Sequence, residues 1–121
     1  MPINILLTNN PYAAERYKGA YAVSYMDTPA LDVLKAARDM VHGGGRLLSH
    51  PITSGISPKE SPFVSIIILP NGHGTDFDSV KIIESAIATY IKIGQPKALP
   101  ENIKKDYMII DCEMLTKEIR V

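Results

Sequence analysis

The stretch FVSIIIL, residues 63–69, decides the fold because it is apolar at almost every position. A strand that faces solvent on one side alternates polar and apolar residues, whereas a strand covered on both sides is apolar throughout. We therefore expect residues 63–69 to form a central strand of a sheet that has helices packed on both of its faces.

Segments on the N-terminal side supply neighbours for this strand. The run INILLTNN at 3–10 indicates a first strand that ends in a turn, and YAVSYMD at 21–27 has the alternation and the residue types of a second strand. A helix is predicted to follow, because Thr28 and Pro29 offer an N-cap and a first-turn proline and the glycines at 43–45 end it.

The C-terminal half is predicted to continue the alternation of strands and helices. Apolar residues recur at helical spacing over 80–91, after an N-cap at Thr75 or Asp76 and before Gly94. The segment YMIID at 107–111 is predicted to form a fifth strand, and a short helical segment follows it.

With RLLSH at 46–50 as a third strand, the pattern predicts an α/β domain with an about five-stranded, mostly parallel sheet and helices on both faces. Residues 1–121 are expected to form a single domain, since the length fits one core and no linker or repeat divides the chain. The direction of the strand at 63–69 stays open, because the connection before it is long enough for a hairpin or a crossover. A hairpin would move His73 to the edge of the sheet opposite the loop at 49–63.

Charge and composition argue against several classes of function. Thirteen basic and thirteen acidic residues cancel, so there is no bulk attraction for nucleic acid or an anionic membrane. The apolar runs are far shorter than the roughly 18 to 20 residues of a spanning helix, and no signal-peptide pattern is present. The single cysteine, Cys112, excludes an internal disulfide and a multi-cysteine metal site. We expect a cytoplasmic protein with no nucleic-acid or membrane partner, no metal and no cofactor.

Four segments in a distinctive order run along almost the whole chain: TNNP at 8–11, RDMVHGG at 38–44, RLLSHPITSGISPKESPF at 46–63 and IIESAIATY at 82–90. Together they resemble the GrdX family, small proteins encoded among the genes of the glycine, sarcosine and betaine reductase systems of amino-acid-fermenting anaerobes. The resemblance implies an accessory protein without an assigned activity, distinct from the selenoprotein that cleaves the substrate and from the subunit that makes acetyl phosphate.

The long loop departs from the pattern of that family at several positions. Ser54 and Gly55 stand in reversed order, Ser57 occupies a position where lysine is usual, and Lys59 occupies one where asparagine is usual. A role that requires a lysine at one fixed point of the loop is therefore not supported.

The segment SHPITSGISPKESPF, residues 49–63, is the leading candidate for a binding site. Its three prolines restrict φ and disfavour helix in the residues before them, so one stiff conformation is expected. Hydroxyl groups, a conformationally free glycine and backbone N–H groups suit an anion or a carboxylate, although the same side chains can instead cap the loop's own backbone. The candidate ligand-binding residues are Asn9, Asn10, His50, Thr53, Ser54, Gly55, Lys59, Glu60 and His73.

Several of these candidates have a structural alternative. His50 follows a strand, where it can act as an acid, a base or a hydrogen-bond donor, or can bond to nearby backbone. Asn9 and Asn10 can contact a ligand, yet Asn-Asn-Pro is also an ordinary turn sequence. Glu60 can contact a partner or clamp the loop, and His73 lies in a glycine-containing segment that matches no phosphate-binding motif.

The preferred hypothesis is a non-catalytic accessory protein that binds a small anionic ligand or a partner protein, such as a protein of the reductase complex, through residues 49–63. A small enzyme that acts on an acyl or phosphoryl group with His50 as acid or base is one alternative. An assembly protein with a flat protein–protein interface is the other. The sequence leans against an enzyme, because it shows no base-and-orienter pair beside a nucleophile, and it leaves a homo-oligomer open.

Overall fold

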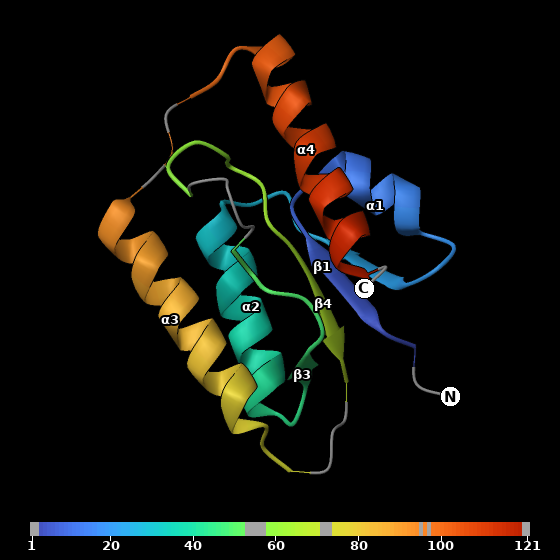
Figure 1. The fold of residues 1–121 in the computed structure, drawn as a ribbon, viewed down its shortest axis with the longest axis vertical. Helices are drawn as coiled ribbons and strands as arrows, with labels where there is room; N and C mark the ends of the chain where they lie inside the picture. The colour runs from blue at the N-terminus through green and yellow to red at the C-terminus, as the bar shows by residue number, and fades with distance from the viewer. Residues whose placement is uncertain (1–2, 53–57, 71–73, 95, 97, 120–121) are drawn as a thin grey trace.

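The structure is a computed structural model that describes residues 3–52, 58–70, 74–94, 96 and 98–119. In this part of the chain the strands are β1 (Ile5–Thr8), β2 (Ala22–Tyr25), β3 (Arg46–Leu47) and β4 (Ser65–Leu69). The helices are α1 (Pro11–Tyr17), α2 (Ala30–His42), α3 (Phe77–Ile93) and α4 (Glu101–Ile119). Figure 1 shows α2 and α3 on one side of the sheet and α1 and α4 on the other.

The described strands form one sheet in the order β2-β1-β4-β3. β1 runs parallel to β2, with Leu6 opposite Val23, and antiparallel to β4, with Leu6 opposite Ile67. β3 is also antiparallel to β4. The α/β class is confirmed, but the prediction of about five mostly parallel strands is wrong, because only one pair is parallel and β4 returns as in a hairpin.

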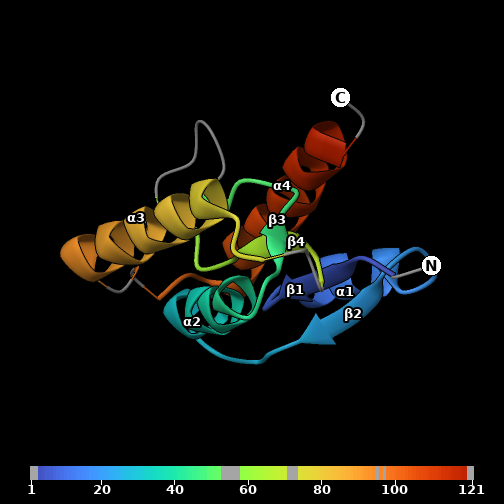
Figure 2. The same ribbon diagram turned by 90° about the horizontal axis from the view of Figure 1, so that it is seen from below.

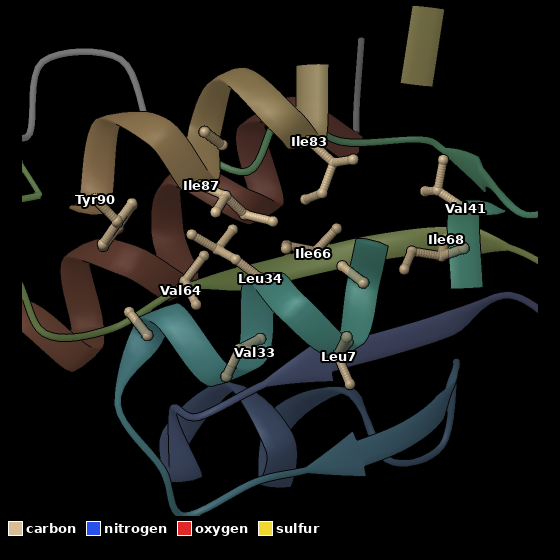
Figure 3. Close-up of a cluster of buried hydrophobic side chains, with 13 residues drawn as sticks. Leu7, Val33, Leu34, Val41, Val64, Ile66, Ile68, Ile83, Ile87 and Tyr90 are labelled. Carbon is tan, nitrogen blue, oxygen red and sulfur yellow. The ribbon is translucent and has the colours of Figure 1, made fainter. Parts of the chain in front are cut away.

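The two faces of β4 explain its apolar sequence. Ile66 and Ile68 belong to a large core that also contains residues of α2 and α3, whereas Ile67 packs with Leu6 and with Leu115 of α4. Figure 3 shows the larger core between the sheet and the two helices. The prediction of a central strand covered on both faces is therefore confirmed.

The boundaries of α2 and α3 follow local signals. The Asp76 carboxylate accepts a hydrogen bond from the Ser79 N–H and caps α3, and Gly94 ends this helix with a φ of 84°. α2 begins after Pro29 without a side-chain cap, and the buried Thr28 hydroxyl makes no hydrogen bond to any described residue. The prediction that Thr28 caps α2 is therefore wrong.

The C-terminal region differs most from the expectation. Residues 107–111, predicted as a strand, lie inside α4, because Asp111, Cys112 and Leu115 are buried at helical spacing along one face of that helix. The short helix α1 was also not predicted. It begins at Pro11, where Asn10 supplies the N-cap.

The antiparallel direction of β4 sets the positions of the candidate loops. β4 begins beside Thr8, the last residue of β1, and ends beside Ile5. The loop at 49–63 therefore reaches the sheet at the carboxyl end of β1. The connection after β4 leaves the sheet at the other end of the strands, beside the start of β1. His73 itself is not among the described residues. None of the helices that the structure describes is both long enough and apolar enough to cross a membrane.

Candidate functional site

The candidate loop at 49–63 is fixed to the sheet and to α4 where it begins. The Ser49 Oγ accepts a hydrogen bond of 2.9 Å from the Ile67 N–H, and the Leu48 N–H donates to the Ile67 carbonyl at 2.8 Å. The backbone N–H of His50 donates to the Glu118 Oε1 of α4 at 2.6 Å. The first residues of the loop are therefore held by β4 and by the last turns of α4.

Asn9 holds the other end of the loop. Its Nδ2 donates to the Pro62 carbonyl at 2.9 Å and to the Thr28 carbonyl at 3.0 Å, and its Oδ1 accepts from the Val64 N–H at 2.9 Å. The residue is only 7 % exposed. Both amide hydrogens and one oxygen lone pair are thus used inside the protein, so a ligand could contact only the second lone pair of Oδ1 without displacing an internal bond.

Between these anchors, the loop presents polar side chains to solvent. His50, Lys59 and Glu60 are exposed. The His50 Nδ1 lies 3.1 Å from the backbone nitrogen of Ile52 and 3.0 Å from the carbonyl oxygen of Ile52. One nitrogen of the ring is therefore held by the loop's own backbone. Of the remaining loop candidates, Thr53, Ser54 and Gly55 lie outside the described residues.

Asn10, the other asparagine candidate, connects α1 to α4. Its Oδ1 accepts from the N–H groups of Tyr12 at 3.0 Å and Ala13 at 3.4 Å, which caps α1. Its Nδ2 donates to the Met108 carbonyl at 2.9 Å and to the Asp111 Oδ2 at 2.8 Å. Asn10 is fully buried, and its whole amide is engaged within the chain.

The Asp111 carboxylate completes a buried polar cluster, which we name the Asp111 cluster (Thr8, Asn10, Ser65 and Asp111). The Asp111 Oδ2 accepts from the Ser65 hydroxyl at 2.7 Å, and the Ser65 Oγ lies 2.7 Å from the Thr8 Oγ1. Burial raises the pKa of Asp111, while the hydrogen bonds from Asn10 and Ser65 oppose that rise. The cluster attaches α4 to the central strands beside the anchored loop.

Sequence reasoning did not select Asp111 as a site residue. The one available signal was a single carboxylate within the otherwise apolar run YMIIDC at 107–112. A charged group at such a position must find buried partners, and here it finds them on the loop side of the sheet.

The described residues do not assemble a catalytic pair. No histidine among them is hydrogen-bonded to a serine or a cysteine, and none of their acidic, histidine or cysteine side chains form a group of three able to hold a metal ion. Cys112 is buried, and burial raises the pKa of its thiol although Arg16 acts in the opposite direction. A buried thiol with a raised pKa is a poor nucleophile at neutral pH.

Two cavities of about 240 Å³ each lie away from the loop. One is lined by Leu31, Tyr90, Ile91, Gly94 and Pro96, and the other by Met40, Gly43, Gly45, Ile68 and Pro70. Neither includes a candidate residue from the sequence, so the cavities and the predicted binding residues do not coincide.

Comparison with known proteins identifies a family. Residues 5–120 match the family described as GrdX-like protein. No curated protein and no solved structure matches the chain. The match covers nearly all of the described residues, including both anchors of the loop and the Asp111 cluster.

Proposed function

Because the chain belongs to the GrdX-like protein family, we propose that it is a non-catalytic accessory protein of the glycine, sarcosine and betaine reductase system. In this proposal it binds a partner protein of that system through residues 49–63. The observation that carries the proposal is that this loop is anchored at both ends, by Ser49 and His50 at its start and by Asn9 at its end.

Anchoring favours recognition because binding has a cost in conformational entropy. A loop whose ends are already fixed loses less freedom when it meets a partner, so more of the contact energy appears as affinity. Each anchor bond involves a backbone group on at least one side, and the side chains of His50, Lys59 and Glu60 are exposed. The imidazole near the start of the loop and the adjacent Lys59 and Glu60 near its end can form directional contacts that set the orientation of a partner.

The geometry favours a protein over a small molecule as the ligand. A small-molecule site encloses most of its ligand in a concave pocket. Neither of the two cavities described above is lined by a candidate residue, and the amides of Asn9 and Asn10 are engaged in internal bonds. A small anion is the second candidate, because the ring of His50 is held through Nδ1 and its Nε2 makes no hydrogen bond to any described residue.

The test is capture of purified reductase subunits on the immobilised protein, with His50→Ala compared with His42→Ala. Both histidines are exposed, but His42 lies at the end of α2, near Glu84 of α3, and not on the loop. We expect capture by the wild type and by His42→Ala, and a loss of at least tenfold in affinity with His50→Ala. Equal binding by all three proteins, or no binding by the wild type, would refute the role of the loop.

A thermal-shift series with acetyl phosphate, phosphate, glycine, sarcosine and betaine tests whether the ligand of the loop is a small molecule and not a partner protein. A ligand present at a hundredfold excess over its dissociation constant stabilises the folded state by about 2.7 kcal/mol. A shift that His50→Ala abolishes and His42→Ala retains would replace the partner protein by a small ligand at the same loop.

A further inference from the structure

The strand β2 forms an edge of the sheet, and no described residue hydrogen-bonds to the backbone on its outer side. Its hydrogen bonds to β1 include those from the Ala22 N–H to the Asn4 carbonyl at 3.0 Å and from the Met26 N–H to the Thr8 carbonyl at 2.9 Å. In a parallel pair, alternate residues direct their backbone groups to the same neighbour. The N–H and C=O groups of Val23 and Tyr25 therefore point away from β1, and Figure 2 shows β2 at the margin of the sheet.

The opposite edge is protected, whereas β2 is not. β3 is only two residues long, and the Leu47 N–H on its outer side donates to the Ser79 Oγ of α3 at 2.9 Å. β2 contains no charged residue and no proline, and Ala22, Ser24 and Tyr25 are exposed. Edge strands normally carry such protection, because an open edge pairs readily with another strand.

We propose that β2 pairs in the antiparallel direction with the β2 of a second copy of this chain, about a two-fold axis at Ser24. In this register Val23 of one copy lies opposite Tyr25 of the other. Both residues point their backbone groups outward, so each such pair can exchange two hydrogen bonds, and the two-fold axis generates the pair twice. The two sheets then continue into one another.

The side chains are compatible with this register. Val23 and Tyr25 pair with Leu6 and Thr8 of β1, so both lie on the face of the sheet that α4 covers. Across the dimer axis they form pairs of an aromatic and a β-branched residue, a favourable combination on neighbouring strands. Tyr25 is 45 % exposed in the single chain and would lose much of this exposure.

The charges in and beside β2 do not oppose pairing with a second copy. The strand Ala22–Tyr25 carries no charged side chain, so no like charges meet when it lies beside its own copy. Lys18 is ion-paired with Glu15 at the end of α1, at 2.5 Å, and lies before the paired residues. The edge is thus complementary to itself in backbone pattern and is not opposed by its own charge.

The interface is small, so the dimer must depend on concentration. Stable interfaces bury about 1,200 to 2,000 Å² in total, and a strand of four residues contributes less than that. The test is sedimentation velocity over a wide range of protein concentration. We expect the mass to rise from the 13.3 kDa of one chain towards twice that value.

Two variants and a control test the edge itself. Tyr25→Lys places a cation on the edge, and Tyr25→Pro removes an outward N–H while sparing the bonds to β1. The control, Ile91→Lys, makes a comparable apolar-to-charged change at an exposed position of α3. We expect dimerisation to weaken at least tenfold in both Tyr25 variants and to persist in the control, with unchanged circular dichroism spectra. A wild type that stays monomeric throughout, or Tyr25 variants that dimerise like the wild type, would overturn the proposal.

Discussion

Replacing Asp111 tests whether the buried polar cluster attaches α4 to the sheet. In Asp111→Ala, the Asn10 Nδ2 and the Ser65 hydroxyl lose the acceptor that they contact at 2.8 and 2.7 Å. A buried donor left without a partner costs about 1–3 kcal/mol. Ser65 can redirect its O–H to the Thr8 Oγ1, whereas one Asn10 amide hydrogen has no alternative acceptor in the cluster. We therefore expect the free energy of unfolding at pH 7 to fall by about 1–3 kcal/mol.

Asp111→Asn separates the hydrogen bonds from the charge. The asparagine keeps one oxygen as acceptor but cannot ionise. Because burial raises the pKa of Asp111 above 3.8, the folded state favours the protonated acid. The contribution of Asp111 to the free energy of unfolding is therefore fully present below the pKa of this carboxyl in the unfolded chain. It is lost as pH rises through the pKa of the same carboxyl in the folded protein. Asp111→Asn is therefore expected to be at least as stable as the wild type at pH 7, with this advantage disappearing towards acidic pH.

The assay is urea unfolding followed by circular dichroism at several pH values. Glu113→Ala serves as control, because its ion pair with Arg16 lies at the surface, with the Glu113 side chain 53 % exposed, and contributes less than about 1 kcal/mol. A loss below about 1 kcal/mol in Asp111→Ala would refute the reasoning about the cluster. So would a loss in Asp111→Asn as large as that in Asp111→Ala.

Three further experiments test the Asn9 anchor of the loop, the burial of the Cys112 thiol and the packing of the hydrophobic core. Asn9→Ala removes three internal hydrogen bonds and should lower the free energy of unfolding by about 2–4 kcal/mol, with faster amide exchange at Val64; unchanged exchange there would argue against the anchor. Cys112 should react with a thiol reagent far more slowly in the native protein than in urea, because it is fully buried, and equal rates would contradict that burial. Ile83→Ala should cost about 2–5 kcal/mol in urea unfolding, because this side chain is fully buried between α3 and the sheet, and a cost near zero would place it outside the core.

The parts of the fold that the sequence predicted are those with a strong local signal. The run at 63–69 is apolar at positions that point to both faces of the sheet, and only a central strand buries side chains on both faces. The segment at 107–111 has five residues, too few to separate a strand from one turn of a longer helix. The helix α4 forms instead, because its buried and half-buried positions recur at helical spacing from residue 104 to residue 115. The direction of β4 depends on pairing with β1, which is distant in the sequence and leaves no local pattern.

The candidate site was predictable in its location but not in its bonding. Asn9 and Asn10 were selected because they follow a strand, and they do lie beside the loop at 49–63. Their partners, such as Pro62 and Asp111, are distant in the sequence, so the use of both amides as internal connections could not be derived from residue types alone. The binding role of the exposed loop residues stays a prediction.

Hydrogen exchange of the protein with and without a captured reductase subunit tests the central claim most directly. Binding is expected to slow exchange of the backbone amides within residues 49–63 and to leave the amides of α3 unchanged. Protection confined to another surface, such as the β2 edge or the exposed side of α3, would contradict the assignment of this loop as the recognition surface.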